Sequence, residues 1–269
     1  MQADFIAYKS SQVHYSYGGN GQHVLLCLHG YGESESSFHF LEKYLPSQYQ
    51  LIAIDMPWHG KTQWKEEEAF TVSDLLQITD SVLAARRLSN APITLLGYSM
   101  GGRMSLSLLQ AAPHRIQKMA LLAPDGLKVN FWYWLATQTW LGNQLFRFTM
   151  KHPAWFFYII LAGNKLGVLN RSVYNFAKHY IHEKTMRRQL YIRWTGFRKI
   201  RPDLKLIKKE IAQHKIEVHL VYGAYDRIIR HERGTKFSKG IENYCKLHII
   251  QAGHQLLQEK NAALIAGLL

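Results

Sequence analysis

The sequence has few of the features that mark disulfide-linked, secreted or membrane-spanning proteins. Its two cysteines, Cys27 and Cys245, each lie in an apolar run typical of a strand, so we expect buried thiols and no disulfide framework. No uncharged apolar run reaches the ~18 residues that a transmembrane helix needs. The first residues, from Met1 to Tyr17, lack the basic-then-apolar order of a secretory signal. These absences predict a cytoplasmic protein.

Acidic residues are scarce in one part of the chain. Residues 126–205 contain 14 Lys and Arg but only two acids, Glu183 and Asp203, whereas the other residues carry a net charge of only +2. The same segment holds 17 of the 34 aromatic residues of the chain. No nucleic-acid-binding motif accompanies this charge, and charge alone is a poor sign of such a partner, so we expect no nucleic acid. One segment, and not the whole chain, is basic and aromatic.

Outside this segment, short apolar runs alternate with stretches of helical periodicity. The runs expected to form strands are 5–8, 13–17, 24–28, 51–54, 93–96, 119–122, 218–222 and 247–250. The segments expected to form helices are 71–88, 100–112, 206–214 and 261–269. This alternation predicts an α/β protein with a doubly wound, mostly parallel sheet. The sequence of residues 126–205 predicts helices and no clear strands. We interpret this segment as an insertion into a core formed by 1–125 and 206–269.

The clearest chemical motif is Gly97-Tyr98-Ser99-Met100-Gly101, a Gly-x-Ser-x-Gly sequence between an apolar strand and a helix. This is the setting that a nucleophile elbow requires, because a tight strained turn projects the serine beyond the end of the sheet. Small residues at both ends of the motif allow neighbouring backbone to pass close by. The sequence therefore predicts Ser99 as a nucleophile, with the N–H of Met100 at the helix start as one oxyanion donor.

A second motif, His29-Gly30-Tyr31-Gly32, follows an earlier apolar run. The two motifs, with an Asp and a His late in the chain, resemble the α/β-hydrolase family over nearly the whole chain except the insertion. The resemblance implies a mostly parallel eight-stranded sheet flanked by helices, with an inserted helical cap over 126–205. It also implies that the N–H of Tyr31 is the second oxyanion donor. We expect His29 to orient its loop by hydrogen bonding to backbone and not to react.

The order of catalytic residues in this family implies a late histidine and an acid before it. His254 follows Gly253 just after the last expected strand, which is the place of the general base. Asp226 follows the preceding strand and is the expected acid. Asp125 stays as an alternative, because a minority of relatives take the acid from the strand before that. The chain shows no metal-ligand spacing, and the implied chemistry needs no cofactor.

The resemblance to serine-dependent members implies hydrolysis of a carboxylic ester with an apolar or medium-length acyl chain. A thioesterase or carrier-protein esterase that docks an anionic partner on the basic cap is the alternative. Two further hypotheses are that the chain cleaves carbon–carbon bonds or that it is a non-catalytic ligand receptor. Several explanations of the basic, aromatic cap also stay open: a solvated cap with aromatic side chains inward, an anionic substrate or carrier, or a membrane surface.

Overall fold

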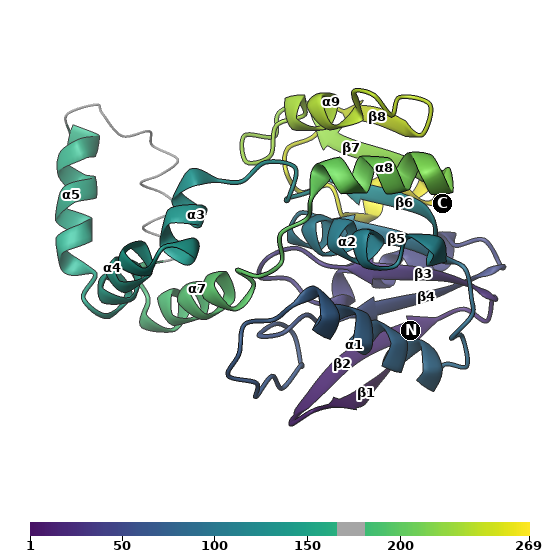
Figure 1. The fold of residues 1–269 in the computed structure, drawn as a ribbon, viewed down its shortest axis with the longest axis horizontal. Helices are drawn as coiled ribbons and strands as arrows, with labels where there is room; N and C mark the ends of the chain where they lie inside the picture. Colours follow the sequence, from purple (N-terminus) through teal and green to yellow (C-terminus); the bar gives the residue numbers. More distant parts are fainter. Residues whose placement is uncertain (166–180) are drawn as a thin grey trace. The chain divides into compact units, whose positions relative to one another are not determined.

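The structure of the chain is a computed structural model that describes residues 1–165 and 181–269 (Figure 1). The chain forms two compact units. The first contains residues 1–128 and 199–269, and the second contains residues 129–198.

The first unit contains one eight-stranded sheet with the strand order β1-β2-β4-β3-β5-β6-β7-β8 (Figure 1). β1 pairs antiparallel with β2, and β2 with β4, whereas the other five pairings are parallel. The strands are β1 (Gln2–Tyr8), β2 (Ser11–Gly18), β3 (His23–Leu28), β4 (Tyr49–Ile54), β5 (Ile93–Tyr98), β6 (Ile116–Leu122), β7 (Glu217–Gly223) and β8 (Cys245–Ile250). The predicted mostly parallel eight-stranded sheet is confirmed.

The central strands are covered on both faces. Every residue of β4 and β5 is buried, as their mainly apolar sequences predict for parallel strands between two layers of helices. The helices of this unit are η1 (Glu35–Tyr44), α1 (Val72–Ala85), α2 (Met100–Ala111), η2 (Pro113–Arg115), α8 (Leu204–His214), α9 (Glu232–Ser238), η3 (Glu259–Asn261) and α10 (Ala262–Ala266). α2 packs against both α1 and α8 in one layer, and η1 packs against α10 in the other. The expected buried thiols are confirmed, since Cys27 and Cys245 are free and buried.

Helix ends follow local chemistry. α1 begins at a capping box, in which Thr71 accepts from the backbone N–H of Asp74 and the Asp74 carboxylate accepts from the N–H of Thr71. It ends before the expected boundary at residue 88, because Arg87 takes a left-handed conformation with φ of 59°. The last helix, expected over 261–269, is only the short α10.

The second unit is helical where it is described. Its helices are α3 (Phe131–Gln138), α4 (Trp140–Lys151), α5 (Ala154–Lys165) and α7 (Lys184–Gly196). Aromatic rings join α4 to α7, because the ring of Phe146 lies 5.2 Å from that of Tyr191 and 5.5 Å from that of Trp194. Part of the expected insertion, residues 166–180, lies outside the described residues. That the insertion caps Ser99 stays a prediction.

No helix within residues 1–165 and 181–269 is both long enough and apolar enough to span a bilayer.

Candidate active site

Ser99 occupies a strained turn between β5 and α2. Its φ and ψ of 49° and −111° are rare for a residue with a side chain. Backbone hydrogen bonds hold this conformation: the N–H of Ser99 donates to Leu122 O at 2.9 Å, and Ser99 O accepts from the N–H of Asp125 at 2.8 Å. The end of β6 and the residues after it therefore fix a turn that places Ser99 just beyond the carboxyl end of β5.

The glycines of the motif are required by close backbone approach. A Cβ atom on Gly101 would lie 1.7 Å from Leu28 O at the end of β3, so α2 could not pack where it does with alanine there. A Cβ atom on Gly97 would lie 2.5 Å from Ser105 Oγ and 2.8 Å from Gly101 O. These close approaches bring the start of α2 directly against the loop that follows β3.

His254 lies between Ser99 and Asp226. Its Nε2 is 3.2 Å from Ser99 Oγ, and its Nδ1 is 2.7 Å from Asp226 Oδ2. With Nδ1 donating to the carboxylate, Nε2 is left as an acceptor for the serine proton. The loop that carries His254 passes over β7 at Gly223, where a Cβ atom would lie 2.2 Å from Gly253 O. The structure thus brings together the three residues expected to react.

Asp226 is buried and hydrogen-bonded on both carboxylate oxygens. Its Oδ1 accepts from the N–H of Ile228 at 2.8 Å and of Ile229 at 2.9 Å. Burial alone raises the pKa of this carboxyl, but the hydrogen bonds from His254 and from these two N–H groups outweigh it and lower the pKa below 3.8. Asp226 is therefore an anion at neutral pH, next to the imidazole that would become a cation.

The alternative acid, Asp125, has a different partner. Its Oδ2 lies 3.3 Å from Arg103 Nε on α2, and its Oδ1 accepts from the N–H of Gly126 at 2.8 Å. The carboxylate against His254 Nδ1 is that of Asp226. The geometry favours Asp226 over Asp125 as the partner of the histidine.

The loop after β3 carries Tyr31 and begins with His29. The imidazole of His29 is fully buried and makes two backbone contacts, Nδ1 with Gly30 O at 2.8 Å and Nε2 with the N–H of Met56 at 3.0 Å. Since Met56 N–H donates, Nε2 is an acceptor and the proton is on Nδ1, so the ring is neutral. The expected hydrogen bonding of His29 to backbone is confirmed, and its role in orienting the loop stays a prediction. Met100 is the first residue of α2, where backbone N–H groups have no partner within the helix.

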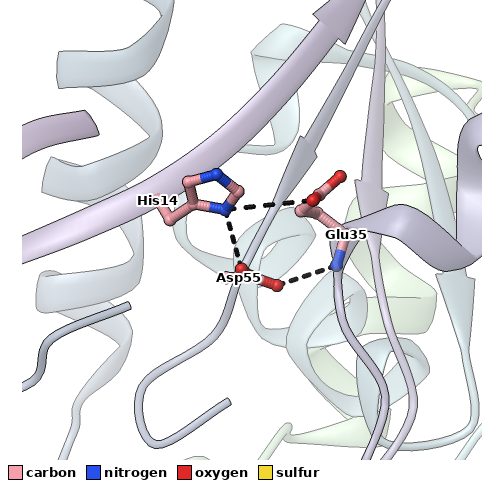
Figure 2. Close-up of side chains that lie close together, drawn as sticks. All are labelled: His14, Glu35 and Asp55. Carbon is pink, nitrogen blue, oxygen red and sulfur yellow. Dashed lines mark hydrogen bonds and ion pairs between the residues drawn. The ribbon is translucent and has the colours of Figure 1, made fainter. Parts of the chain in front are cut away.

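Three other buried side chains form a hydrogen-bonded cluster: His14 on β2, Glu35 on η1 and Asp55 after β4 (Figure 2). One ligand atom from each lies within 4.8 Å of the others, so the set could hold a metal ion. Protein donors already use the Asp55 carboxylate, however. Oδ1 accepts from the N–H of Glu35 at 2.8 Å, and Oδ2 is 2.8 Å from both His14 Nδ1 and the N–H of Lys61. The hydrogen bonds of this cluster therefore link the loop after β4 to the segment following Tyr31.

Two residues near the histidine were not indicated by the sequence. The phenol of Tyr98 donates to His254 O at 3.2 Å and so holds the backbone of the loop that carries His254. Glu33, three residues after Gly30, has a pKa raised by burial, which hydrogen bonds from Gly30 N–H and Ser37 and the charge of His254 only partly offset. Tyr98 occupies an unspecified position of the Gly-x-Ser-x-Gly motif, and Glu33 lies just after the motif of residues 29–32. Their contacts with the histidine loop form only when segments distant in the sequence meet, so the motifs alone do not indicate them.

A basic hollow of about 650 Å³ lies elsewhere on the first unit, between the loop after β6, the start of α8, and α9. Buried Leu127 and Phe237 contribute apolar surface to it. Its cationic lining residues are Lys128, Lys205, Lys208, Arg230, Arg233 and Lys236. Glu232 is the acid among the lining residues, and it pairs with Arg230. The lining of the hollow is therefore complementary to a ligand that carries an anionic group next to an apolar group.

Comparisons with known proteins agree with this fold. Residues 23–260 match the sequence profile of the family described as alpha/beta hydrolase fold. The uncharacterized hydrolase YugF of Bacillus subtilis (strain 168) is 24% identical over 263 residues, which cover 92% of this chain and 89% of that protein. Monoacylglycerol lipase ABHD6 of Homo sapiens is 25% identical over 132 residues, 48% of this chain but only 39% of that protein. A solved thermophilic esterase from Thermogutta terrifontis, 15% identical, has the same fold, with a TM-score of 0.70 over 99% of this chain and 97% of that one.

Proposed function

The chain belongs to the α/β-hydrolase fold family, and from this premise we propose that it is a serine hydrolase that cleaves carboxylic esters with apolar or medium-length acyl chains. The observation that carries the proposal is the continuous contact from Ser99 through His254 to Asp226. Named relatives that are hydrolases and lipases agree with it.

In the proposed cycle, Ser99 Oγ attacks the ester carbonyl while His254 Nε2 takes the hydroxyl proton. The Asp226 anion holds the imidazole in its Nδ1–H form and stabilises the imidazolium. The backbone N–H groups of Tyr31 and Met100 hold the oxyanion, and each such donor contributes about 3 kcal/mol to transition-state stabilisation. The alcohol leaves with the proton from His254, and a water molecule activated by the same imidazole then releases the acid.

The test is hydrolysis of p-nitrophenyl esters of increasing acyl length by the wild type and by Ser99→Ala. We expect an optimum at medium length and at least a ~10⁴-fold loss of kcat in the variant. Ser89→Ala, at an exposed serine outside the site, is the matched control and should keep wild-type rates. The proposal fails if the wild type is no faster than Ser99→Ala at every acyl length and does not react with a fluorophosphonate probe. The chain would then be a non-catalytic receptor.

One observation favours a second candidate, a thioesterase for phosphate-bearing acyl carriers. The basic hollow on the first unit combines six cations with apolar surface, which is the pairing that a phosphorylated acyl thioester presents. The same assay distinguishes the two candidates when it includes an acyl-coenzyme A and the matching acyl-N-acetylcysteamine, which lacks the phosphates. A thioesterase should prefer the coenzyme A thioester, and NaCl should remove that preference. Equal rates on the two thioesters would leave the simple-ester reading.

A further inference from the structure

Large apolar side chains are exposed on the helices of the second unit. Among the described residues, eighteen large hydrophobic side chains are exposed, and eleven of them lie between residues 129 and 161. They are Val129, Phe131, Trp132, Trp134, Trp140, Leu141, Leu145, Phe148, Tyr158, Ile159 and Leu161. Large apolar side chains exposed in such number within one unit indicate an interaction surface more often than solvated protein.

On α4 these side chains form a stripe. Leu141, Leu145 and Phe148 follow the i, i+4, i+7 spacing that places residues on one side of a helix. Their exposed fractions are 72%, 51% and 52%. A solvated amphipathic helix has polar residues on that side. α4 thus carries apolar side chains on a side that the rest of the second unit does not cover.

α5 repeats the pattern. Tyr158 and Leu161 are exposed with the same helical spacing, and Ile159 lies beside them with 55% of its surface exposed. No charged residue occurs in α5 before its last residue, Lys165. Two helices of this unit therefore each have an apolar side that the rest of the unit leaves uncovered.

The charged residues around these helices are almost all basic, and Glu183, directly before α7, is the acid among residues 129–198. From Gly126 to His182 the chain has no acidic residue. Arg147 and Lys151 are exposed on α4 beside the apolar stripe, and Lys184 and Arg188 are exposed on α7. Aromatic and aliphatic side chains flanked by Lys and Arg are the composition of helices that lie in the headgroup region of an anionic bilayer.

From these stripes and their predominantly basic surroundings, we infer that α4 and α5 bind the surface of an anionic lipid bilayer. The partner is a bilayer and not a second copy of the chain, because a symmetric contact through this segment would bring like charges together. Exposed Trp132 and Trp140 suit the interface, where an indole ring is apolar on its face and polar at its N–H. The inference goes beyond the proposed hydrolysis, since binding a bilayer needs no reaction.

The test is co-sedimentation of the full chain with vesicles of phosphatidylcholine alone and of phosphatidylcholine mixed equally with phosphatidylglycerol. We expect binding to the mixed vesicles, weak binding to the neutral ones, and a loss of binding as NaCl screens the charges. The double variant Leu141→Ser/Leu145→Ser should bind the mixed vesicles at least about tenfold more weakly. Leu206→Ser/Leu264→Ser, at two exposed leucines of the first unit, is the matched control and should bind as the wild type does.

Three outcomes would overturn the inference: no binding to mixed vesicles, equal loss in both double variants, or a dimer in solution that Leu141→Ser/Leu145→Ser dissociates. Circular dichroism of each variant separates loss of the surface from loss of the fold. The result is also separable from the proposed function. Ser99→Ala should bind vesicles as the wild type does, and hydrolysis of a soluble short-chain p-nitrophenyl ester should be equal in both leucine variants.

Discussion

At the scale of single residues, Asp226 is held as an anion by protein donors. Two backbone N–H groups and the imidazole of His254 surround its carboxylate, and together they lower its pKa despite burial. A carboxylate in this setting fixes the imidazole tautomer, because only Nδ1–H can face it. An amide in its place can present its N–H₂ group to Nδ1 and so select the wrong tautomer.

Asp226→Asn should therefore lower kcat for p-nitrophenyl ester hydrolysis by about 10³–10⁴-fold with little change in KM, as steady-state kinetics can measure. Asp125→Asn is the matched control, since that carboxylate pairs with Arg103, and it should keep kcat within about threefold. The reverse result, with Asp125→Asn inactive and Asp226→Asn active, would transfer the acid role to Asp125.

The same pKa has a consequence for stability. Because the folded pKa of Asp226 is lowered from 3.8, its contribution to stability is present above the unfolded pKa and is lost as pH falls through the folded value. The difference in the free energy of unfolding between the wild type and Asp226→Asn should thus shrink as pH falls below about 4. Denaturant titrations at neutral and acidic pH measure it, and a difference that grows on acidification would contradict the lowered pKa.

At the scale of elements, Gly101 allows α2 to pack closely against the end of β3. Gly101→Ala would place a Cβ atom 1.7 Å from Leu28 O, so the helix must move away from the strand. Because Ser99 and Met100 begin that helix and Tyr31 follows that strand, the movement separates the two expected oxyanion donors. We expect a loss of several kcal/mol in unfolding free energy, of the order seen for overpacking and strained backbone, and a loss of hydrolysis.

The control for this change is Gly253→Ala. Nothing lies within 4 Å of a Cβ atom at Gly253, and its φ is not in the left-handed region, although it precedes His254. Thermal unfolding should show a large fall in Tm for Gly101→Ala and less than about 2 °C for Gly253→Ala. Equal melting temperatures for Gly101→Ala and the wild type would mean that the contact between α2 and β3 relaxes without cost.

At this scale the sequence predicts the elements that depend on residues close to one another along the chain. The apolar run before Ser99 and the small residues around it specify a strand, a turn and a helix locally, and the structure has all three. The hydrogen-bonded cluster of His14, Glu35 and Asp55 was not predictable in this way, because β2, η1 and the loop after β4 meet only in the folded protein. The sequence likewise predicted that residues 126–205 are helical, but not which side of α4 the rest of its unit leaves uncovered, since the apolar spacing is the same in either case.

At the scale of the whole molecule, positive charge is unevenly distributed. The chain carries a formal net charge of +14, and Gly126 to His182 has no acid that could offset its cations. The described acid–base pairs of this basic chain lie mostly in the first unit, for example Arg103 with Asp125 and Arg115 with Asp80. Mutual repulsion within the second unit therefore opposes its compact state and is screened by salt.

Raising NaCl from a low concentration to the physiological range should thus raise Tm, whereas a protein with balanced charge changes little. Relief of about 1 kcal/mol of repulsion corresponds to roughly 2–4 °C for a chain of this size, and differential scanning fluorimetry can resolve it. Arg188→Gln and Lys184→Gln, at exposed positions of α7, should reduce the salt dependence, because each removes a cation from the repelling set. Lys246→Gln is the opposite case, since Lys246 Nζ lies 3.2 Å from Glu217 Oε1, and its loss should leave the salt dependence of Tm unchanged or increase it. If all three variants and the wild type gained the same Tm on adding salt, the gain would be a general effect of the salt on hydration, and repulsion within the second unit would not be its cause.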